Sequence, residues 1–169
     1  MAYNPSFRER YAKMSLDPID YRILRELQEN GRLTNVELSE RVGLSPSPCL
    51  RRVKALEEAG LIHGYHAVLN REELGLRLTI FVSVKVAHRE EEIRPTFWEA
   101  VQALPEIITC HLVSGDADFL LQVVVPDLAA YERFLLGTLL KLPGVRDVRS
   151  NFAIKAIKPH TLLPLGHLR

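Results

Sequence analysis

The spacing of apolar residues divides the chain into two parts. Up to about Leu74, apolar side chains recur every three or four residues, as on the buried side of an α-helix; from Leu76 onward, alternating strand-like segments are interleaved with helical ones. A chain of 169 residues is long enough for one sizeable domain or two small ones. The pattern therefore predicts a helical N-terminal part and a C-terminal part that mixes strands with helices.

Three short helices are predicted in the first part. Asp17 suits the N-cap of the first helix, with Pro18 at its first position and Gly31 at its end. The second helix begins at "TNVE", a capping box in which Thr34 is the cap, and runs only to the tight turn expected at Gly43. The third helix follows this turn at once.

The third helix begins at "SPSPCLRRVKALEEAG". With Ser45 as the N-cap, Pro46 and Pro48 fall in the first turn, where backbone N–H groups have no intrahelical acceptor, so neither proline removes a hydrogen bond. Helical geometry puts Arg52 on the flank of this helix. It places Cys49, Leu50, Val53 and Leu56 on the inward side and Ser47, Pro48, Arg51, Lys54 and Ala55 on the opposite side.

The segment "LIHGYHAVLN" follows Gly60 and is predicted to form a short strand or hairpin. Three short helices, a glycine turn between the last two and a wing of this kind are the layout of a winged helix-turn-helix. We expect the helix-turn-helix over about residues 35–54, within a DNA-binding domain of residues 16–77, after a flexible, slightly basic arm of residues 1–15.

The second part shows the order strand, helix, strand, strand, helix, strand. The strands are expected in "LRLTIFVSVKVA", "EIITCHLV", "FLLQVVV" and "RDVRSNFAIKAIK". The helices are expected in "EEEIRPTFWEAVQAL", with Phe97, Trp98, Val101 and Leu104 inward, and in "DLAAYERFLLGTLLKL", capped by Asp127. This βαββαβ order predicts a ferredoxin-like domain over residues 78–158, followed by a tail of residues 159–169, and an α+β fold class.

Positive charge is concentrated on the third helix. The net charge of the chain is only +1, but four cations and no acid lie between Arg41 and Leu56. The major groove of B-DNA admits an α-helix, and DNA phosphates attract a cationic surface. A merely solvated basic face is the alternative, but the helix-turn-helix spacing and the wing favour DNA binding. The expected contact residues are Thr34, Ser45, Ser47, Pro48, Arg51, Arg52 and Lys54.

These residues have different expected roles on double-stranded DNA. Arg51 can make a bidentate contact to a guanine edge, and Ser47 and Lys54 can reach a base or a phosphate. Pro48 can touch a thymine methyl group. Arg52, Thr34 and the helix N-termini, such as the one at Ser45, are expected to position the DNA backbone.

The stretch "CHLVSGDADFLL" contains other candidate chemistry. Neighbouring residues in a strand point to opposite faces, so Cys110 and His111 are not expected to form a nucleophile–base pair. Gly115, Asp116 and Asp118 form a loop whose carboxylates suit an ammonium group and whose backbone amides suit a carboxylate. An ordinary hairpin turn is the alternative, because glycine and aspartate are common turn residues.

Composition excludes several classes of protein. The hydrophobic share of 47% and the charged share of 25% are typical of a globular protein and argue against disorder. No apolar run approaches the roughly 18 residues of a membrane span, and the N-terminus does not resemble a secretory signal. Cys49, expected to be buried, and Cys110 do not suggest a disulfide framework, which favours a reducing cytosol. No catalytic residue, metal or cofactor is expected.

The chain resembles the Lrp/AsnC, or feast/famine, family of transcriptional regulators over about residues 16–158. The matching stretches are "LDPIDYRILRELQENGR", "NVELSERVGLSPSPCLRRVKALEEAGLIHGY", "CHLVSGDADFLL", "VPDLAAYERF" and "LPGV". Those around "SPSPCLRRV" and "CHLVSGD" are most similar to the leucine-responsive branch. The resemblance implies an effector domain that regulates amino-acid metabolism (a RAM domain), in homodimers whose sheets pack together and that commonly assemble into octamers.

The resemblance also places an amino-acid effector between dimers, around the glycine–aspartate loop. The chain is thus expected to be a cytoplasmic, nucleoid-associated regulator that binds double-stranded DNA and leucine or another amino acid, with no membrane contact. Two other functions stay open: an architectural DNA-binding protein without an effector, and a tetrapyrrole decarboxylase of the kind that resembles this family, which the intact basic helix disfavours. The positions matching the effector motif are Leu112, Gly115, Asp116, Asp118, Leu128, Asn151 and Phe152.

Overall fold

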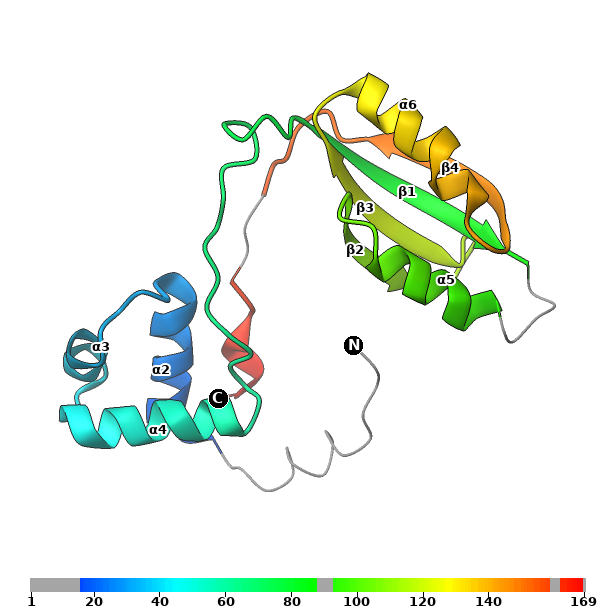
Figure 1. The fold of residues 1–169 in the computed structure, drawn as a ribbon. Helices are drawn as coiled ribbons and strands as arrows, with labels where there is room; N and C mark the ends of the chain where they lie inside the picture. The colour runs from blue at the N-terminus through cyan, green and yellow to red at the C-terminus, as the bar shows by residue number, and fades with distance from the viewer. Residues whose placement is uncertain (1–15, 88–92, 159–161, 169) are drawn as a thin grey trace. The chain divides into compact units, whose positions relative to one another are not determined.

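The structure is a computed structural model, and it describes residues 16–87, 93–158 and 162–168 (Figure 1). The arm expected over residues 1–15 lies outside the described residues. No helix in the described part of the chain is long and apolar enough to cross a membrane.

The first of two compact units, Met1–Val68 with Lys158–Arg169, is built from helices. Its described helices are α2 (Pro18–Glu29), α3 (Asn35–Val42), α4 (Pro46–Glu58) and the short 3-10 helix η2 (Leu165–Leu168). Removing apolar side chains from water is the main contribution that holds such helices together. The core of the unit consists of Ile23, Leu24, Leu38, Val42, Cys49 and Leu56.

The helix starts that the sequence predicts are confirmed. Asp17 accepts hydrogen bonds from two backbone N–H groups at the start of α2, at 2.8 and 2.9 Å. Thr34 accepts one from the N–H of Glu37, whose carboxylate accepts the N–H of Thr34 in return. Ser45 occupies the N-cap position of α4 and Pro46 its first position, although the Ser45 side chain makes no capping bond.

Two details of these helices differ from the sequence prediction. Helix α2 ends at Glu29 with Asn30 as its C-cap, so Gly31 follows the helix end as expected, but Gly31 is not left-handed. The Asn30 side chain instead accepts the N–H of Arg32 at 3.0 Å. Leu50 is 45% exposed rather than inward. At about 100° per residue it lies on the flank of α4, while its neighbour Cys49 fills the inward position.

The strand or hairpin expected at residues 61–70 is not formed. Gly60, with a φ of 72°, ends α4, and Leu61 packs against the helical core. The residues that follow form no helix and pair with no strand. Tyr65 instead donates a hydrogen bond from its hydroxyl to Glu57 of α4 at 3.0 Å. Burial and this bond raise the pKa of Tyr65 to about 12, so the phenol remains a donor.

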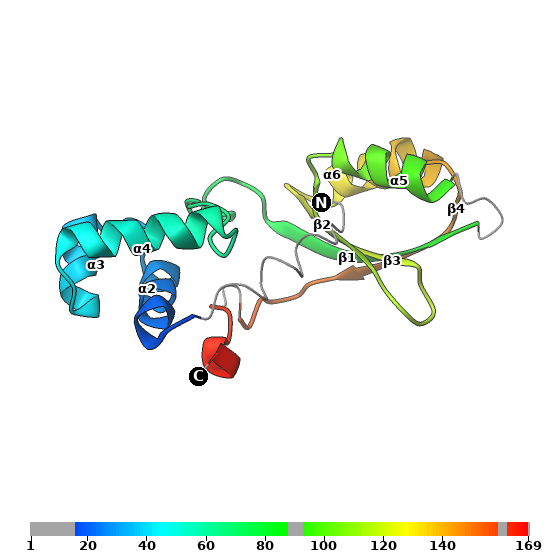
Figure 2. The ribbon, with the colours of Figure 1, turned by 90° about the horizontal axis from the view of Figure 1, so that it is seen from below.

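The second unit, Leu69–Ile157, contains a sheet of four antiparallel strands in the order β2-β3-β1-β4. Helices α5 and α6 lie on the same face of this sheet (Figure 2). The ferredoxin-like βαββαβ plan and the α+β fold class are therefore confirmed. The elements are β1 (Leu78–Val86), α5 (Ile93–Gln102), β2 (Ile107–Leu112), β3 (Phe119–Val125), α6 (Leu128–Gly137), η1 (Leu139–Lys141) and β4 (Val145–Phe152).

The core of this unit lies between the sheet and its two helices. Ile80, Val82 and Val84 alternate along β1 toward the helices, as the period of two residues in a strand requires. Phe97 of α5 packs on Phe119, with ring centroids 4.7 Å apart. Trp98 is 44% exposed rather than inward, because the next helical position points about 100° away from Phe97.

The last helix and the last strand are shorter than the sequence suggests. Helix α6 is capped by Asp127 as expected but ends at Gly137, and only the short η1 follows. Strand β4 ends at Phe152, beside the start of β1, since its hydrogen-bonding partner begins there. The N–H of Ala153 makes a last bond to the carbonyl of Thr79 at 2.9 Å.

Candidate functional site

The turn between α3 and α4 fixes the direction of α4. Gly43 adopts a φ of 74°, in the left-handed region that favours glycine, and the N–H of Leu44 bonds to the carbonyl of Ser39 at 2.9 Å. The Asn35 amide at the start of α3 donates to the carbonyl of Pro46 at 2.8 Å. The two helix N-termini are thus held next to each other, which places Thr34 near the first turn of α4.

The outward face of α4 is cationic and open. Arg51 and Lys54 are exposed, and within the described residues neither makes an ion pair or a hydrogen bond, so both charges are available to a partner. Ser45 and Ser47 are exposed as well, whereas Pro48 is half-buried. A shallow groove of about 410 Å³ on this face is lined by Ser47, Leu50, Arg51, Lys54, Ala55 and Glu58.

Arg52 is arranged differently from Arg51. Its Nη1 lies 2.7 Å from Asp17 Oδ2 and 2.7 Å from Asp20 Oδ1, and the Asp20 carboxylate is buried. The backbone N–H of Asp20, together with the guanidinium, holds the pKa of Asp17 below its ordinary value. Arg52 therefore ties α4 to the start of α2. The sequence signal for this role was the pair of acids at the first turn of α2.

The glycine–aspartate loop between β2 and β3 is held by backbone bonds and one side chain. The N–H of Val113 bonds to the carbonyl of Asp118 at 2.9 Å, and Asp118 Oδ2 accepts the N–H of Val86 at 2.9 Å. Gly115 has a φ of 118°, which strongly favours glycine. Asp116 is exposed. One oxygen of Asp118 thus has a structural role, which sequence reasoning missed.

The residues that match the effector motif lie at two opposite ends of the sheet. Leu112 is opposite Phe119, at the start of β3, whereas Leu128 follows the end of β3. Seven residues of strand span about 20 Å, which is much longer than one amino acid. Within one chain, the structure therefore separates Leu112, Gly115, Asp116 and Asp118 from Leu128, Asn151 and Phe152.

The last two of these residues point to opposite faces of the sheet. Phe152 lies on the helix-covered face, where its ring meets that of Tyr131 edge-on at 5.5 Å. Asn151 pairs with Phe81, whose side chain is 40% exposed on the other face. A ligand on one face of the sheet can therefore contact only one of the two side chains.

Cys110 and His111 also point to opposite faces, because they lie opposite Leu121 and Leu120 of β3. Burial raises the pKa of the Cys110 thiol, which disfavours the thiolate. Within residues 16–87, 93–158 and 162–168, no group of three or more histidine, cysteine, aspartate or glutamate side chains is placed to hold a metal ion.

Both units match known families. Residues 16–63 match the winged helix-turn-helix DNA-binding family, and residues 79–163 match the Lrp/AsnC ligand binding domain. The chain belongs to the Lrp/AsnC family. It is accordingly a DNA-binding transcriptional regulator with an amino-acid ligand-binding domain, and its relatives are regulators rather than enzymes.

Leucine-responsive regulatory proteins are among the relatives. That of Haemophilus influenzae is 46% identical over 93% of this chain and 95% of its own length. That of Escherichia coli is 51% identical over 85% of this chain and 87% of its own.

Two solved structures have the same fold. A transcriptional regulator of Neisseria meningitidis, solved as a complex with L-methionine, has a TM-score of 0.88 and 49% identity, covering 91% of this chain and 99% of that one. An AsnC family regulator of Agrobacterium tumefaciens has a TM-score of 0.85 and 41% identity, covering 90% and 99%.

Proposed function

We propose that this regulator reads its operator by laying the outward face of α4 in the major groove. The observation that carries this proposal is the pair Arg51 and Lys54, two exposed cations without a partner in the described residues, on a face with no acid before Glu57. Arg51 contacts a base edge, Lys54 a phosphate, and Ser45, Ser47 and Thr34 support the backbone. Pro48 contributes at most an apolar contact, since it is half-buried.

Arg52 has an indirect part in this proposal. Because its guanidinium is held by Asp17 and Asp20, it orients α4 and does not itself contact phosphate. The DNA contacts expected from the sequence thereby separate into direct contacts on the outward face and one residue, Arg52, that positions the helix.

The effector is a small apolar amino acid such as leucine or methionine. A relative of 49% identity was solved with L-methionine, and other relatives are leucine-responsive proteins by name. Leu112 and Leu128 are 61% and 64% exposed, so a bound ligand can cover apolar surface that one chain leaves in water. The carboxylates of Asp116 and Asp118 suit the ammonium group of such a ligand.

Copies of the chain assemble to complete this site. Within the described part of the second unit, α5 and α6 cover one face of the sheet (Figure 2). The other face carries the ring of Phe81, which is 40% exposed. Sheet-to-sheet packing covers that face in a homodimer, and dimers join further, toward an octamer, to bring the two groups of effector residues together. The effector then changes how the paired α4 helices meet two half-sites about one turn of DNA apart.

The test is a binding titration with fragments of the DNA upstream of the chain's own coding region. Arg51→Ala should lower operator affinity by about 1–3 kcal/mol and relax the sequence preference, while Lys54→Ala should weaken all sequences alike and reduce the salt dependence. L-leucine and L-methionine, with L-aspartate as the control, are added to each titration. Unchanged affinity in both variants would exclude this face as the DNA contact, and no response of the wild-type chain to either apolar amino acid would exclude the effector.

A further inference from the structure

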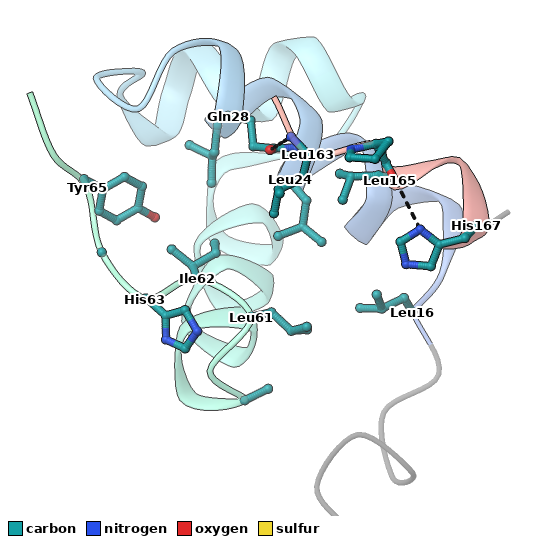
Figure 3. Close-up of a pocket in the computed structure, with 14 residues that line it drawn as sticks. Leu16, Leu24, Gln28, Leu61, Ile62, His63, Tyr65, Leu163, Leu165 and His167 are labelled. Carbon is teal, nitrogen blue, oxygen red and sulfur yellow. Dashed lines mark hydrogen bonds between the residues drawn. The ribbon is translucent and has the colours of Figure 1, made fainter. Parts of the chain in front are cut away.

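The C-terminal residues 162–168 pack on the helical unit, although the sequence alone gave them no role. Leu165 is half-buried against the core formed by α2, α3 and α4. The N–H of Leu163 donates to Gln28 Oε1 of α2 at 2.7 Å, and His167 Nδ1 lies 3.1 Å from the carbonyl of Pro164 (Figure 3). The tail therefore makes both an apolar and a polar contact with this unit.

The tail is one wall of an apolar groove of about 750 Å³, to which it contributes Leu163, Pro164, Leu165 and His167. One wall of the groove is helix α2, with Leu24 and Leu27, and another is the segment that follows α4, with Leu61 and Ile62. Gln28 supplies the hydrogen-bond acceptor at its edge. Without the tail, this row of leucine and isoleucine side chains has more of its apolar surface in water, which is unfavourable.

Two separate stretches of chain line this groove. The segment after α4 leads into β1, and the tail is reached from the end of β4. In the sheet unit these two stretches start side by side, since the N–H of Ala153 bonds to the carbonyl of Thr79 at 2.9 Å. In the helical unit both line the same groove. The chain therefore connects the two units twice, once through the segment after α4 and once through the stretch that follows Ala153.

We propose that residues 162–168 are a strap that packs against α2 and gives the effector unit a second attachment to the DNA-binding unit. A single linker lets a domain rotate, whereas a second attachment limits the orientations it can take. The inference rests on the proposed coupling of effector to DNA binding. It goes beyond that function because it assigns the coupling to the tail as well as to residues 69–77, which connect the helical unit to β1.

The small docked area makes the strap releasable. Among the tail side chains that the structure describes, Leu165 packs on the core, while Leu163 is 70% exposed. Docking is intramolecular, so even weak contacts hold the tail in place at the high effective concentration that a short tether gives. A docked and a released state of this kind is a two-state element that an effector can bias.

The first experiment tests docking in the full chain. Leu165→Asp puts a carboxylate against the core and should release the tail. Gly166→Asp is the matched control, because a Cβ at Gly166 meets nothing within 4 Å. We expect Leu165→Asp to raise hydrogen exchange of the α2 amides and to lower the melting temperature of the helical unit by about 5 °C, with little change in Gly166→Asp. If the α2 amides exchange hydrogen equally fast in the wild type and in Leu165→Asp, the proposed docking of the tail is wrong.

The second experiment tests coupling. The ratio of operator affinities with and without L-leucine or L-methionine is measured for the wild type and for both variants. The strap predicts that Leu165→Asp reduces this ratio several-fold while effector binding, measured by calorimetry, is retained. If Leu165→Asp releases the tail but has the same ratio of operator affinities as the wild type, the strap proposal is wrong and the proposed function is unaffected. If the wild-type chain binds the operator equally well with and without the amino acid, the proposed function itself is contradicted.

Discussion

At the scale of single residues, two adjacent side chains of the same type have different roles. Arg51 and Arg52 are consecutive, yet Arg51 is exposed and without a partner in the described residues, whereas Arg52 bridges two acids of another helix. Sequence periodicity identified the outward face that contains Arg51. It could not identify the bridge, because the distance from Arg52 to Asp17 and Asp20 depends on how α4 crosses α2.

Replacing Arg52 should lower the stability of the helical unit. Arg52→Ala leaves the buried Asp20 carboxylate without its guanidinium, which costs about 1–2 kcal/mol at neutral pH. Arg51→Ala is the control and should leave the free energy of unfolding unchanged. Urea unfolding of both variants measures the difference, and equal stabilities would contradict the role assigned to Arg52.

The same bridge predicts a pH dependence. The pKa of Asp17 is lower in the folded chain than its ordinary value of 3.8, chiefly through the N–H of Asp20 and also through Arg52. The stability that its charge contributes is therefore complete above that ordinary value and is lost as the pH falls through the lower folded value. Between pH 5 and about pH 3, Arg52→Ala should lose less stability than Arg51→Ala. Unfolding curves at several pH values measure this, and parallel losses would contradict it.

Asp118 can be tested separately for its two roles. Its Oδ2 accepts the N–H of Val86, so Asp118→Ala should destabilise the sheet unit as well as disturb any effector contact. Asp118→Asn keeps an acceptor oxygen but removes the charge. We expect Asp118→Asn to retain most of the melting temperature while weakening the effector response, because the ammonium group then loses one of its two carboxylates and keeps only Asp116. A full effector response in Asp118→Asn would show that the charge of Asp118 does not contact the effector.

At the scale of helices and strands, local signals predicted more than distant ones. The caps at Asp17 and Thr34 and the turn at Gly43 were all predictable, because each depends on side chains within a few residues. The strand expected at residues 61–70 was wrong, since a strand requires a partner that sequence spacing does not specify. Leu50 and Trp98 were also wrongly expected to point inward. Each lies one position along its helix from the buried residue, Cys49 or Phe97, and the sequence spacing did not distinguish the two positions.

The turn at Gly43 should tolerate few other residues. Its φ of 74° strains any side chain with a Cβ, although a Cβ there would meet nothing within 4 Å. Gly43→Val should therefore cost about 1–2 kcal/mol of folding free energy, and more than Gly43→Asn, because asparagine adopts this conformation more readily than a β-branched residue. Thermal unfolding of both variants measures the difference. Equal losses would show that crowding rather than backbone conformation limits this position.

At the scale of the whole molecule, the positions of the proposed effector residues bear on how many copies of the chain one site requires. Leu112 and the glycine–aspartate loop lie at one end of the sheet, and Leu128 lies beyond the other. Both motifs were identified from sequence resemblance, but only the strand register shows that they are separated within one chain. If both groups contact one small ligand, they come from different copies.

Effector binding and assembly should therefore depend on each other. A ligand that binds only between copies stabilises the larger assembly by mass action, so L-leucine or L-methionine should shift the distribution of assemblies upward in a dilution series. Native mass spectrometry reports the assembly size and the bound ligand together, with L-aspartate as the control. Asp118→Asn should still assemble at high concentration but show a weaker ligand-dependent shift. Binding of the effector to isolated single chains, with the same affinity at every dilution, would instead place the whole site within one copy.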